Sequence, residues 1–463
     1  MRAAAGLCEK LGRWDVASEE REPVTIESLL KSGAILGHKD GNYGSQYPRV
    51  AEFGSEGVPF LTAKSLNDGR IDIEGAPRLS EQRANDLRFG FVQSGDVLLS
   101  HNATVGRIAV VPNFKGKLLI GTSLTYFRVD SSRILPRYLA AFFTGSDFQA
   151  QLNAVMSQST RNQVPITAQR KLRIVLPSLV EQAAIADILG ALDDKIALIR
   201  EANETQKAIA QAIFKSWFVD FDPVRAKAED REPDGMDAAT AALFPSEFQV
   251  TELGLIPKGW ELKTLADIAT FQNGFAFKSS DWVESGFPVV KIGNVKPGIV
   301  DLNGCSFVRG EATKSLDRFR LSHGDLLAGM TGYVGETGLM PIIDGPCYLN
   351  QRVGKLSAGS GLCDLGFVYC LVRRKEFKTF AEAQAHGSAQ ANVSGVSLMA
   401  YPALIPPPPL VELFNKLASP ILHAILSKHR YSKLLEDLRD TLLPRLISGK
   451  LRVPEAEAML TRV

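Results

Sequence analysis

Cysteine is scarce in this sequence of 463 residues, and it does not occur in closely spaced pairs. The five cysteines are Cys8, Cys305, Cys347, Cys363 and Cys370, and no two of them form a Cys-x-x-Cys motif. An odd number of scattered cysteines argues against a disulfide framework or a structural zinc site. We therefore expect free thiols in a reducing compartment.

Long apolar runs and an excess of charge are also missing. No apolar stretch approaches the roughly 20 residues of a membrane-spanning helix. Glu9 and Lys10 follow the first apolar residues too soon for a signal peptide, so we expect a cytoplasmic protein with no membrane partner. The 53 Lys and Arg nearly balance the 51 Asp and Glu, so a nucleic-acid site would have to gather its basic residues locally.

The sequence lacks the motifs of enzymes that act on DNA or nucleotides. An amino-methyltransferase would show Asn or Asp, two prolines and an aromatic residue, but here valine follows Asp222-Pro223. The nearest match to a phosphate-binding loop, at 448–451, lacks the first glycine and the final hydroxyl. His101 and His386, in polar turns, are the strongest candidates among six scattered histidines, although ordinary surface histidines are commoner. We predict no catalytic residue, metal site or cofactor on this chain.

The chain repeats itself at an offset of 229 residues. Without a gap, 57–116 matches 286–345 at thirteen of sixty positions, including Gly57/Gly286, Gly95/Gly324 and Asp96/Asp325. Glycines, turn residues and apolar strand positions dominate the identities, so the two copies share a backbone geometry. A period this long predicts two homologous modules and excludes a solenoid of short repeats.

Each copy consists of a globular module followed by a helical segment. In the first module we expect short strands at 58–63 with 71–73 and at 96–100 with 107–111 across a turn, and a helix at 137–153. The predicted fold class is α+β, with two homologous mixed α/β modules separated by two long helices in a pseudo-twofold internal repeat.

The helical segments carry apolar residues at alternating intervals of four and three, which is typical of a coiled-coil seam. We expect them to pair antiparallel as a rod about 60 Å long; in the alternative, each helix packs on its own module. Pro420 predicts a kink or late start of the second helix, and Pro444 and Gly449 mark its end. The predicted seam comprises Ile185, Leu189, Leu192, Ile196, Ile199, Ile213, Leu417, Ile421, Leu435, Leu438 and Leu442, with polar interruptions at Asn203, Gln206 and Lys428.

These patterns predict seven consecutive segments. They are an N-terminal extension (1–20), a first module (21–175), a first helical region (176–218), an acidic linker (219–258), a second module (259–405), a second helical region (406–450) and a tail (451–463). Aromatic residues in the linker suggest that it is packed on a surface.

Polar loops follow the strands in both modules. Arg, Lys, Asn and Gln read base edges and hold phosphates, and aromatic rings can stack. A single such loop is more often a solvated turn, but these loops recur in both copies. Their side chains differ, since Arg107 of the first copy aligns with Glu336 of the second. One scaffold would thus carry two different polar surfaces. The candidate DNA-contacting residues are Lys39, Asn42, Tyr43, Lys64, Asn67, Asn102, Arg107, Arg161, Asn162, Gln272, Asn273, Phe275, Lys278, Lys291, Asn294, Lys296, Tyr333, Gln351, Arg352 and Gln390.

Over nearly its whole length the sequence resembles the specificity subunits of type I restriction-modification systems. The resemblance is carried by LPSLVEQAAIADILGALDDKIALI (176–199), the junction at 214–248, NGFAFKSSDW (273–282) and LLPRLISGKLRV (442–453). Leu413-Phe414, in place of Gln182-Ala183, and Pro420 depart from the pattern, which affects only the expected start of the second helix.

The resemblance implies two target-recognition domains and two conserved helical regions that pair as an antiparallel coiled coil. It implies no catalytic site, and a double-stranded DNA target in two parts, with one half-site per domain. Two methyltransferase subunits would dock on the helical regions and restriction subunits would join them. S-adenosylmethionine, ATP and Mg²⁺ would then belong to these partner subunits.

Two other functions stay open at this point. A stand-alone DNA-modifying enzyme is disfavoured by the missing catalytic motifs. A coiled-coil adaptor between proteins, without DNA contact, is the other alternative. It would be favoured if the assembled complex bound all DNA sequences with equal affinity, or bound no DNA at all.

Overall fold

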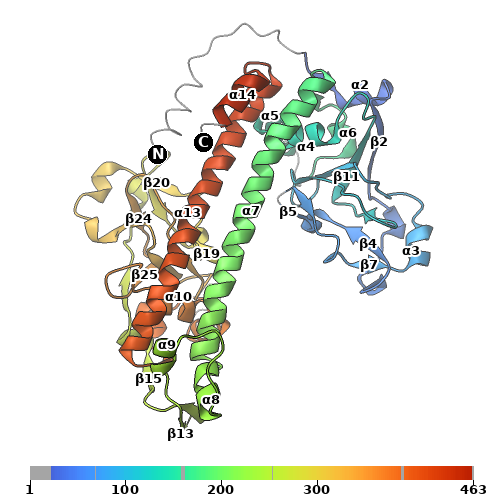
Figure 1. Cartoon of the computed structure of the whole chain (residues 1–463). Helices are drawn as coiled ribbons and strands as arrows, with labels where there is room; N and C mark the ends of the chain where they lie inside the picture. The colour runs from blue at the N-terminus through green and yellow to red at the C-terminus, as the bar shows by residue number, and fades with distance from the viewer. Residues whose placement is uncertain (1–21, 68, 158–161, 253, 387–390, 461–463) are drawn as a thin grey trace. The chain divides into compact units, whose positions relative to one another are not determined.

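In the computed structural model, which describes residues 22–460 except 68, 158–161, 253 and 387–390, the chain forms two compact units. Unit 1 comprises residues 1–198 and 433–463, and unit 2 comprises residues 199–432. Both boundaries fall within the long helices α7 (Leu179–Phe218) and α13 (Pro408–Ile447) (Figure 1). Each unit therefore holds one module and a part of both helices, so the compact units do not follow the linear order of the segments.

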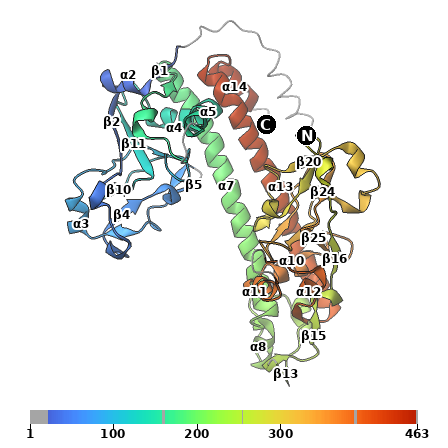
Figure 2. The ribbon, with the colours of Figure 1, turned by 180° about the vertical axis from the view of Figure 1, so that it is seen from behind.

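The module of unit 1 is built on two four-stranded sheets, with the strand orders β2-β11-β8-β9 and β10-β4-β7-β3. The strands are β1 (Val24–Thr25), β2 (Ile35–Asp40), β3 (Phe53–Gly54), β4 (Val58–Leu61), β5 (Leu66–Asn67), β6 (Arg70–Ile71), β7 (Arg78–Leu79), β8 (Val97–Ser100), β9 (Ile108–Val110), β10 (Leu119–Ile120), β11 (Leu124–Val129) and β12 (Arg173–Ile174). The helices are α2 (Ile26–Lys31), α3 (Glu81–Asp86), α4 (Pro136–Thr144), α5 (Ser146–Met156) and α6 (Ile166–Gln169). Helix α4 packs on β8 and β9 of the first sheet, and both views show it beside that sheet (Figures 1 and 2).

The expected pairing across the 100–107 turn is confirmed, because β8 and β9 are antiparallel neighbours. The expected partner of 58–63 is wrong. Strand β4 pairs with β7 and, in parallel, with β10, whereas β6 forms a small hairpin with β5. The side chains of Val58, Phe60 and Leu61 are buried, as is typical of a strand that lies inside a sheet, and β4 has a neighbour on each edge. The helix expected at 137–153 is two helices that meet at Gly145, where a Cβ would lie 2.8 Å from Leu443.

The module of unit 2 contains two five-stranded sheets, ordered β16-β25-β22-β23-β19 and β17-β20-β18-β24-β21. Its strands are β15 (Glu261–Thr264), β16 (Thr270–Asn273), β17 (Trp282–Val283), β18 (Phe287–Val290), β19 (Gly298–Ile299), β20 (Ser306–Val308), β21 (Arg320–Leu321), β22 (Leu326–Gly329), β23 (Thr337–Leu339), β24 (Cys347–Leu349), β25 (Val353–Ser357) and β26 (Pro402–Ile405). Its helices are α10 (Gly366–Val372), α11 (Lys375–Ala383) and α12 (Gly395–Met399).

The repeat seen in the sequence holds at the level of strand register. The parallel pair Phe60↔Leu119 of β4 and β10 has its counterpart, 229 residues on, in Val289↔Tyr348 of β18 and β24. The hairpin β8–β9 corresponds in the same way to β22–β23, and α7 and α13 begin and end 229 residues apart. Backbone geometry is thus duplicated far beyond the stretch in which the sequences agree.

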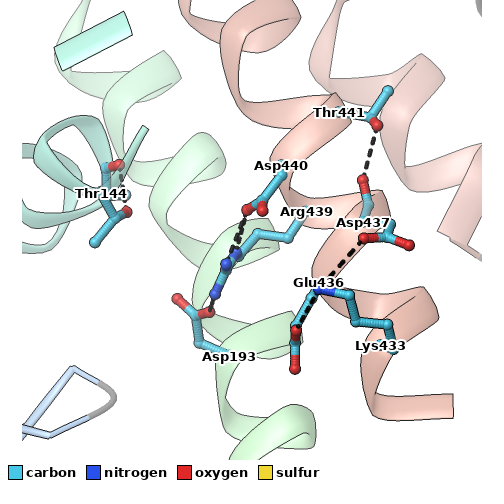
Figure 3. Close-up of polar contacts among 9 residues, drawn as sticks. Thr144, Asp193, Lys433, Glu436, Asp437, Arg439, Asp440 and Thr441 are labelled. Atoms are coloured by element: carbon cyan, nitrogen blue, oxygen red, sulfur yellow. Dashed lines mark hydrogen bonds and ion pairs between the residues drawn. The ribbon is translucent and has the colours of Figure 1, made fainter. Parts of the chain in front are cut away.

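The two long helices pair with each other within each unit, and the predicted antiparallel arrangement is confirmed. In unit 2, Asn203 Nδ2 donates to the Ile425 carbonyl (3.2 Å), and the rings of Phe214 and Phe414 lie 5.7 Å apart. The residue numbers of the contacts on α13 fall as those on α7 rise, as antiparallel helices require. In unit 1, Arg439 Nη1 on α13 donates to Asp193 Oδ1 on α7 at 2.7 Å (Figure 3).

Within each unit, a long helix also forms hydrogen bonds with the module. Gln182 on α7 accepts the Leu135 N–H just before α4, and Asn415 on α13 accepts the Phe367 N–H in α10. A Cβ on Gly366 would lie 2.6 Å from the Ala418 methyl carbon, so α10 packs closely on α13. The two predicted alternatives, pairing of the helices and packing of each helix on a module, are therefore both realised.

Burial follows the predicted seam except in the first half of α13. The prediction that Leu417 belongs to the seam is wrong, because this residue is 43% exposed. Ile421 is only half buried. There the buried face shifts by one position to Ala418, Leu422 and Ile425, because α13 also packs on α10. The structure buries Ile185, Leu189, Leu192, Ile196, Leu435, Leu438 and Leu442, and half buries Ile199 and Ile213.

Helix α13 begins at Pro408 and continues through Pro420, so the predicted late start is wrong. Proline at 420 removes one backbone donor, but about three turns of helix precede it and the buried apolar face holds them in place. The helix ends at Ile447, and Gly449 follows it with a positive φ of 76°. Part of the predicted tail is helical, as α14 (Val453–Leu460).

The segment predicted as a linker is a folded part of unit 2. It contains α8 (Asp222–Ala228), α9 (Ala238–Ala242), β13 (Phe248–Thr251) and β14 (Gly254–Pro257). The rings of Phe221 and Trp260 lie 5.6 Å apart, and those of Trp217 and Phe244 lie 5.3 Å apart. The aromatic residues of this segment therefore join the core around the end of α7, as expected.

Four cysteines lie in the described residues, and all four are free thiols, as predicted. Cys8 lies outside that part of the chain. Within the described residues, no helix is both long enough and apolar enough to span a bilayer.

Candidate nucleic-acid interface

Four polar loops leave the same end of the first module. In the antiparallel order β2-β11-β8-β9, the last residues of β2 and β8 lie beside the first residues of β11 and β9. The loops 41–43, 101–107 and 121–123 therefore emerge together. The loop 62–67 joins them, because the Ala63 N–H donates to Ser123 Oγ at 2.8 Å.

The turn between β8 and β9 in the first module, which we call the tip loop (residues 101–107), is held from both sides. The Ala103 N–H donates to the Asn162 carbonyl (3.0 Å), and the Val164 N–H donates to the His101 carbonyl (2.9 Å). Ala103 has a φ of +63°, a left-handed conformation that costs a non-glycine residue energy. The surrounding hydrogen bonds impose this conformation, so the tip loop is a built feature of the module.

Arg107 braces the neighbouring loop. Its Nη1 donates to the carbonyls of Ala63 (3.1 Å) and Leu66 (3.0 Å) and lies 3.3 Å from Asn67 Oδ1. The guanidinium thus ties the tip loop to residues 62–67. This geometry gives Arg107 a positioning role for the loop that carries Lys64 and Asn67.

The second module repeats the two backbone hydrogen bonds that hold the tip loop of the first. In its tip loop (residues 330–336), the Gly332 N–H donates to the Ala391 carbonyl (2.9 Å) and the Val393 N–H to the Met330 carbonyl (2.9 Å). Thr331 Oγ1 also donates to Asn392 Oδ1 at 2.8 Å. Loops 274–278 and 350–352 reach the same end, because Phe275 bridges Asn350 and the Gln351 N–H donates to the Phe275 carbonyl.

Most of the predicted DNA-contacting residues of the first module lie on its polar loops and are at least partly exposed. Lys39, at the end of β2, places its Nζ 4.5 Å from the centre of the Phe89 ring. Asn102 is half buried in the bridge to Gln163. The exposed residues are Lys39, Asn42, Lys64, Asn67, Arg107 and Asn162.

The second module presents its predicted residues in the same region. Phe275 is half buried between the rings of Phe277 and Phe319, at 5.0 and 5.3 Å. Lys296 Nζ lies 5.9 Å from the centre of the Tyr333 ring. The exposed residues are Asn273, Lys278, Lys296, Tyr333, Gln351 and Arg352.

Two predicted contacts are wrong because their side chains are buried. Tyr43 is 5% exposed, and its hydroxyl donates to the Ile120 carbonyl at 2.8 Å in an aromatic core. Asn294 is 8% exposed and closes its own turn, accepting from the Lys291 N–H and donating to the Asp301 carbonyl. Both residues support loops, and neither is available to a base.

Two further predictions fall on side chains that are already engaged. Gln272 is half buried and donates to the Arg318 carbonyl. Lys291 lies 3.7 Å from the centre of the Trp282 ring and donates to Ser306 Oγ, and its partial burial lowers its pKa. Arg161 and Gln390 lie outside the described residues.

Beneath the loops of the first module lies a buried polar cluster. His38 Nε2 lies 3.0 Å from Gln169 Oε1, and Gln169 Nε2 donates to Thr125 Oγ1. Burial lowers the pKa of His38 to about 4 and also lowers the pKa of His101. His101, which the sequence places in a polar turn, is a buried residue with 1% exposure. His386 is exposed and its backbone pairs with that of Asn392.

Sequence reasoning identified the tip loops but not all of their important residues. Thr104 was not singled out, although the repeat places it opposite Tyr333. Gln163 and Asn392, which bridge to the tip loops, were also missed. The offset of 229 was the signal that could have revealed them, since it pairs all of these positions.

The interface consists of amides, hydroxyls, cations and one exposed aromatic ring, which suit hydrogen bonding to base edges and phosphates. Among the described residues, no three His, Cys, Asp or Glu side chains gather as a metal site would require. The arrangement can recognise a polar surface.

Comparisons with known proteins agree with this geometry. The sequence profile of the type I restriction modification DNA specificity domain matches residues 45–207 and 257–429, one segment in each half of the repeat. The chain is 23% identical over 413 residues to the MjaIX type I restriction enzyme specificity subunit of Methanocaldococcus jannaschii, covering 88% of this chain and 90% of that one. It is 24% identical over 414 residues to the HindI specificity subunit of Haemophilus influenzae, covering 78% and 87%.

A solved structure shares the fold. The crystal structure of the S subunit of a type I restriction-modification system from M. genitalium aligns with a TM-score of 0.52 at 14% identity, covering 94% of this chain and 98% of that one. With the two profile matches together spanning well over half of the sequence, the chain belongs to the type I restriction modification DNA specificity family and is a type I specificity subunit.

Proposed function

We propose that this chain reads a two-part, asymmetric DNA sequence, with one half-site bound by the polar loop end of each module. The chain itself performs no catalysis. It sets the sequence at which methyltransferase subunits modify adenine and restriction subunits cleave, and those partners bind S-adenosylmethionine, ATP and Mg²⁺. Methyltransferase subunits would take the target base out of the duplex while this chain holds the register.

The observation that carries the proposal is the duplicated tip-loop scaffold with non-identical side chains. The bridges Asn102↔Gln163 and Thr331↔Asn392 occupy equivalent positions, as do Arg107 and Glu336, which carry opposite charges. A shared backbone with different donors and acceptors would place two different reading surfaces on the DNA. An asymmetric target follows from that difference.

The helices supply the second part of the proposal. Two methyltransferase subunits would dock on α7 and α13, which the internal repeat makes near-equivalent platforms. Apolar side chains remain exposed on both helices, namely Leu198 and Ile209 on α7 and Leu417 and Leu434 on α13. Exposed apolar residues on paired helices are suited to further helix packing.

The test is to co-express the chain with its methyltransferase subunit in a host that lacks other adenine methylation, and to sequence every modified base. We expect a two-part motif with a constant gap. A contiguous motif, or the same motif without this chain, would overturn the proposal. Methylation that shows no sequence preference would favour the adaptor without DNA contact.

Independent reading by the two modules can be tested in the same cells. Asn273→Ala with Lys278→Ala should relax only one half of the motif, and Lys64→Ala with Asn67→Ala only the other half. If either pair relaxed both halves together, the assignment of one half-site to each module would be wrong.

A further inference from the structure

Tyr333 stands out among the aromatic residues. Its side chain is 62% exposed, and every other Phe, Tyr or Trp in the described part of the chain is buried or half buried. An isolated exposed aromatic ring is costly to keep in water, and such residues are enriched where proteins bind partners. The ring projects from the tip loop of the second module, at the polar end already described.

The backbone under Tyr333 is held on several sides. The Tyr333 N–H donates to the Thr331 carbonyl (2.9 Å), and the Tyr333 carbonyl accepts the Glu336 N–H (3.2 Å). Gly332 and Gly335 both have a φ of +73°, which glycine adopts without strain. The ring is therefore presented by a defined loop, which lowers the entropy lost when it binds.

The first module holds Thr104 in the corresponding place. The Thr104 N–H donates to the Asn102 carbonyl (2.9 Å), as Tyr333 does to Thr331, and the Gly106 N–H donates to the Ser100 carbonyl as Gly335 does to Gly329. These two backbone hydrogen bonds agree, but the side chains do not: one loop presents a short hydroxyl and the other a large ring.

The surroundings of Tyr333 suit nucleic acid. The ammonium of Lys296 lies 5.9 Å from the ring centre, and the exposed Gln351 and Arg352 leave the same end of the sheet. Cations can attract phosphates while the ring makes apolar contact with a base edge, such as a thymine methyl group. Acidic Glu336 is engaged by Lys378 at 3.0 Å.

We infer that Tyr333 is a specificity-determining residue of the second module, whose ring contacts one base pair of its half-site, and that Thr104 is its counterpart in the first module. This inference rests on the proposed function. It adds a position in each module at which the reading surfaces differ, and it predicts that the two positions act independently.

The test uses the assembled complex of this chain with its methyltransferase subunits. Binding is measured for a duplex that contains the motif identified from the modified bases. It is also measured for duplexes in which each base pair of each half-site is replaced in turn. Tyr333→Thr installs the side chain that the same backbone carries in the first module, so the fold should tolerate it. Tyr333→Phe keeps the ring, and Leu262→Thr removes an exposed apolar side chain on β15 as a matched control.

Tyr333→Thr should reduce discrimination at one base pair of one half-site by about tenfold to a hundredfold, which is the usual range for a lost base contact. The other half-site should be read as before. Tyr333→Phe should keep discrimination within about threefold, and Leu262→Thr should change nothing. Thr104→Tyr should alter only the opposite half-site.

Two results would overturn the inference and leave the proposed function intact. In the first, the wild-type complex discriminates among sequences and Tyr333→Thr is indistinguishable from it. In the second, Tyr333→Phe loses as much discrimination as Tyr333→Thr, which would assign the discrimination to the hydroxyl and not to the ring. A wild-type complex that showed no discrimination at either half-site would instead overturn the proposed function.

Discussion

Replacing Arg107 by methionine tests whether this residue positions a loop or contacts DNA itself. The Arg107 guanidinium donates to the carbonyls of Ala63 and Leu66, so its removal frees the loop that carries Lys64 and Asn67. Methionine keeps a long side chain of similar reach but has no donor. The perturbation should therefore leave the sheet intact and loosen a reading loop of the first module.

The magnitude follows from the hydrogen bonds. Nη1 has two hydrogens, so it makes about two bonds to the 62–67 loop, and each contributes a net of about 1 kcal/mol. Loss of about 2 kcal/mol of loop ordering corresponds to about a thirtyfold weaker binding of the half-site read by this module. The half-site read by the second module should be unaffected, because none of its residues contacts Arg107 through these bonds.

The assay is equilibrium binding by the assembled complex at several salt concentrations. A lost phosphate contact would lower the slope of log K against log salt by about 0.9. A lost positioning contact should weaken discrimination at one half-site and leave that slope unchanged. Arg137→Met removes an exposed arginine from α4 of the same module and serves as the control for charge.

A reduced salt slope with intact discrimination would refute the positioning role and restore Arg107 as a phosphate contact. Unchanged binding in all respects would show that the 62–67 loop does not read DNA. Equal losses at both half-sites would contradict the separation of the modules.

Three further outcomes are expected. Leu442→Ala, at a side chain that is 0% exposed, should cost about 2–5 kcal/mol of unfolding free energy in urea titration, whereas Leu434→Ala, at an exposed position, should cost less than about 0.5 kcal/mol; equal costs would mean that the seam is misassigned. Because the pKa of His38 falls from 6.5 to about 4 on folding, the unfolded chain binds the extra proton, and up to about 3 kcal/mol of stability should be lost as the pH falls from 6.5 to 4; an equally steep pH dependence in His38→Gln would contradict this. Arg352→Ala should weaken binding to all sequences and lower the salt slope by about 0.9; a constant slope would exclude phosphate contact.

Much of the architecture was predictable because it depends on local chemistry. Glycines such as Gly57 and Gly298, at φ of +108° and +94°, mark turns that only particular residues adopt easily, so their spacing exposed the repeat. The 4-3 alternation exposed the long helices for a similar reason. Pairing of β4 was not predictable, because its choice between β6 and β7 depends on which distant strand fits its buried faces.

The sequence by itself determined that the chain has two copies of one module and two long helices, since turn residues and apolar periodicity act over a few neighbouring positions. The family was implied by a resemblance to known specificity subunits. Only the tertiary structure decided which polar residues are available to a partner. Tyr43 and Asn294 are buried, Arg107 braces a loop, and Tyr333 is exposed on a loop that its neighbours hold in place. The physical reason is that burial and hydrogen bonding depend on segments far apart in the chain, whose approach no local pattern encodes.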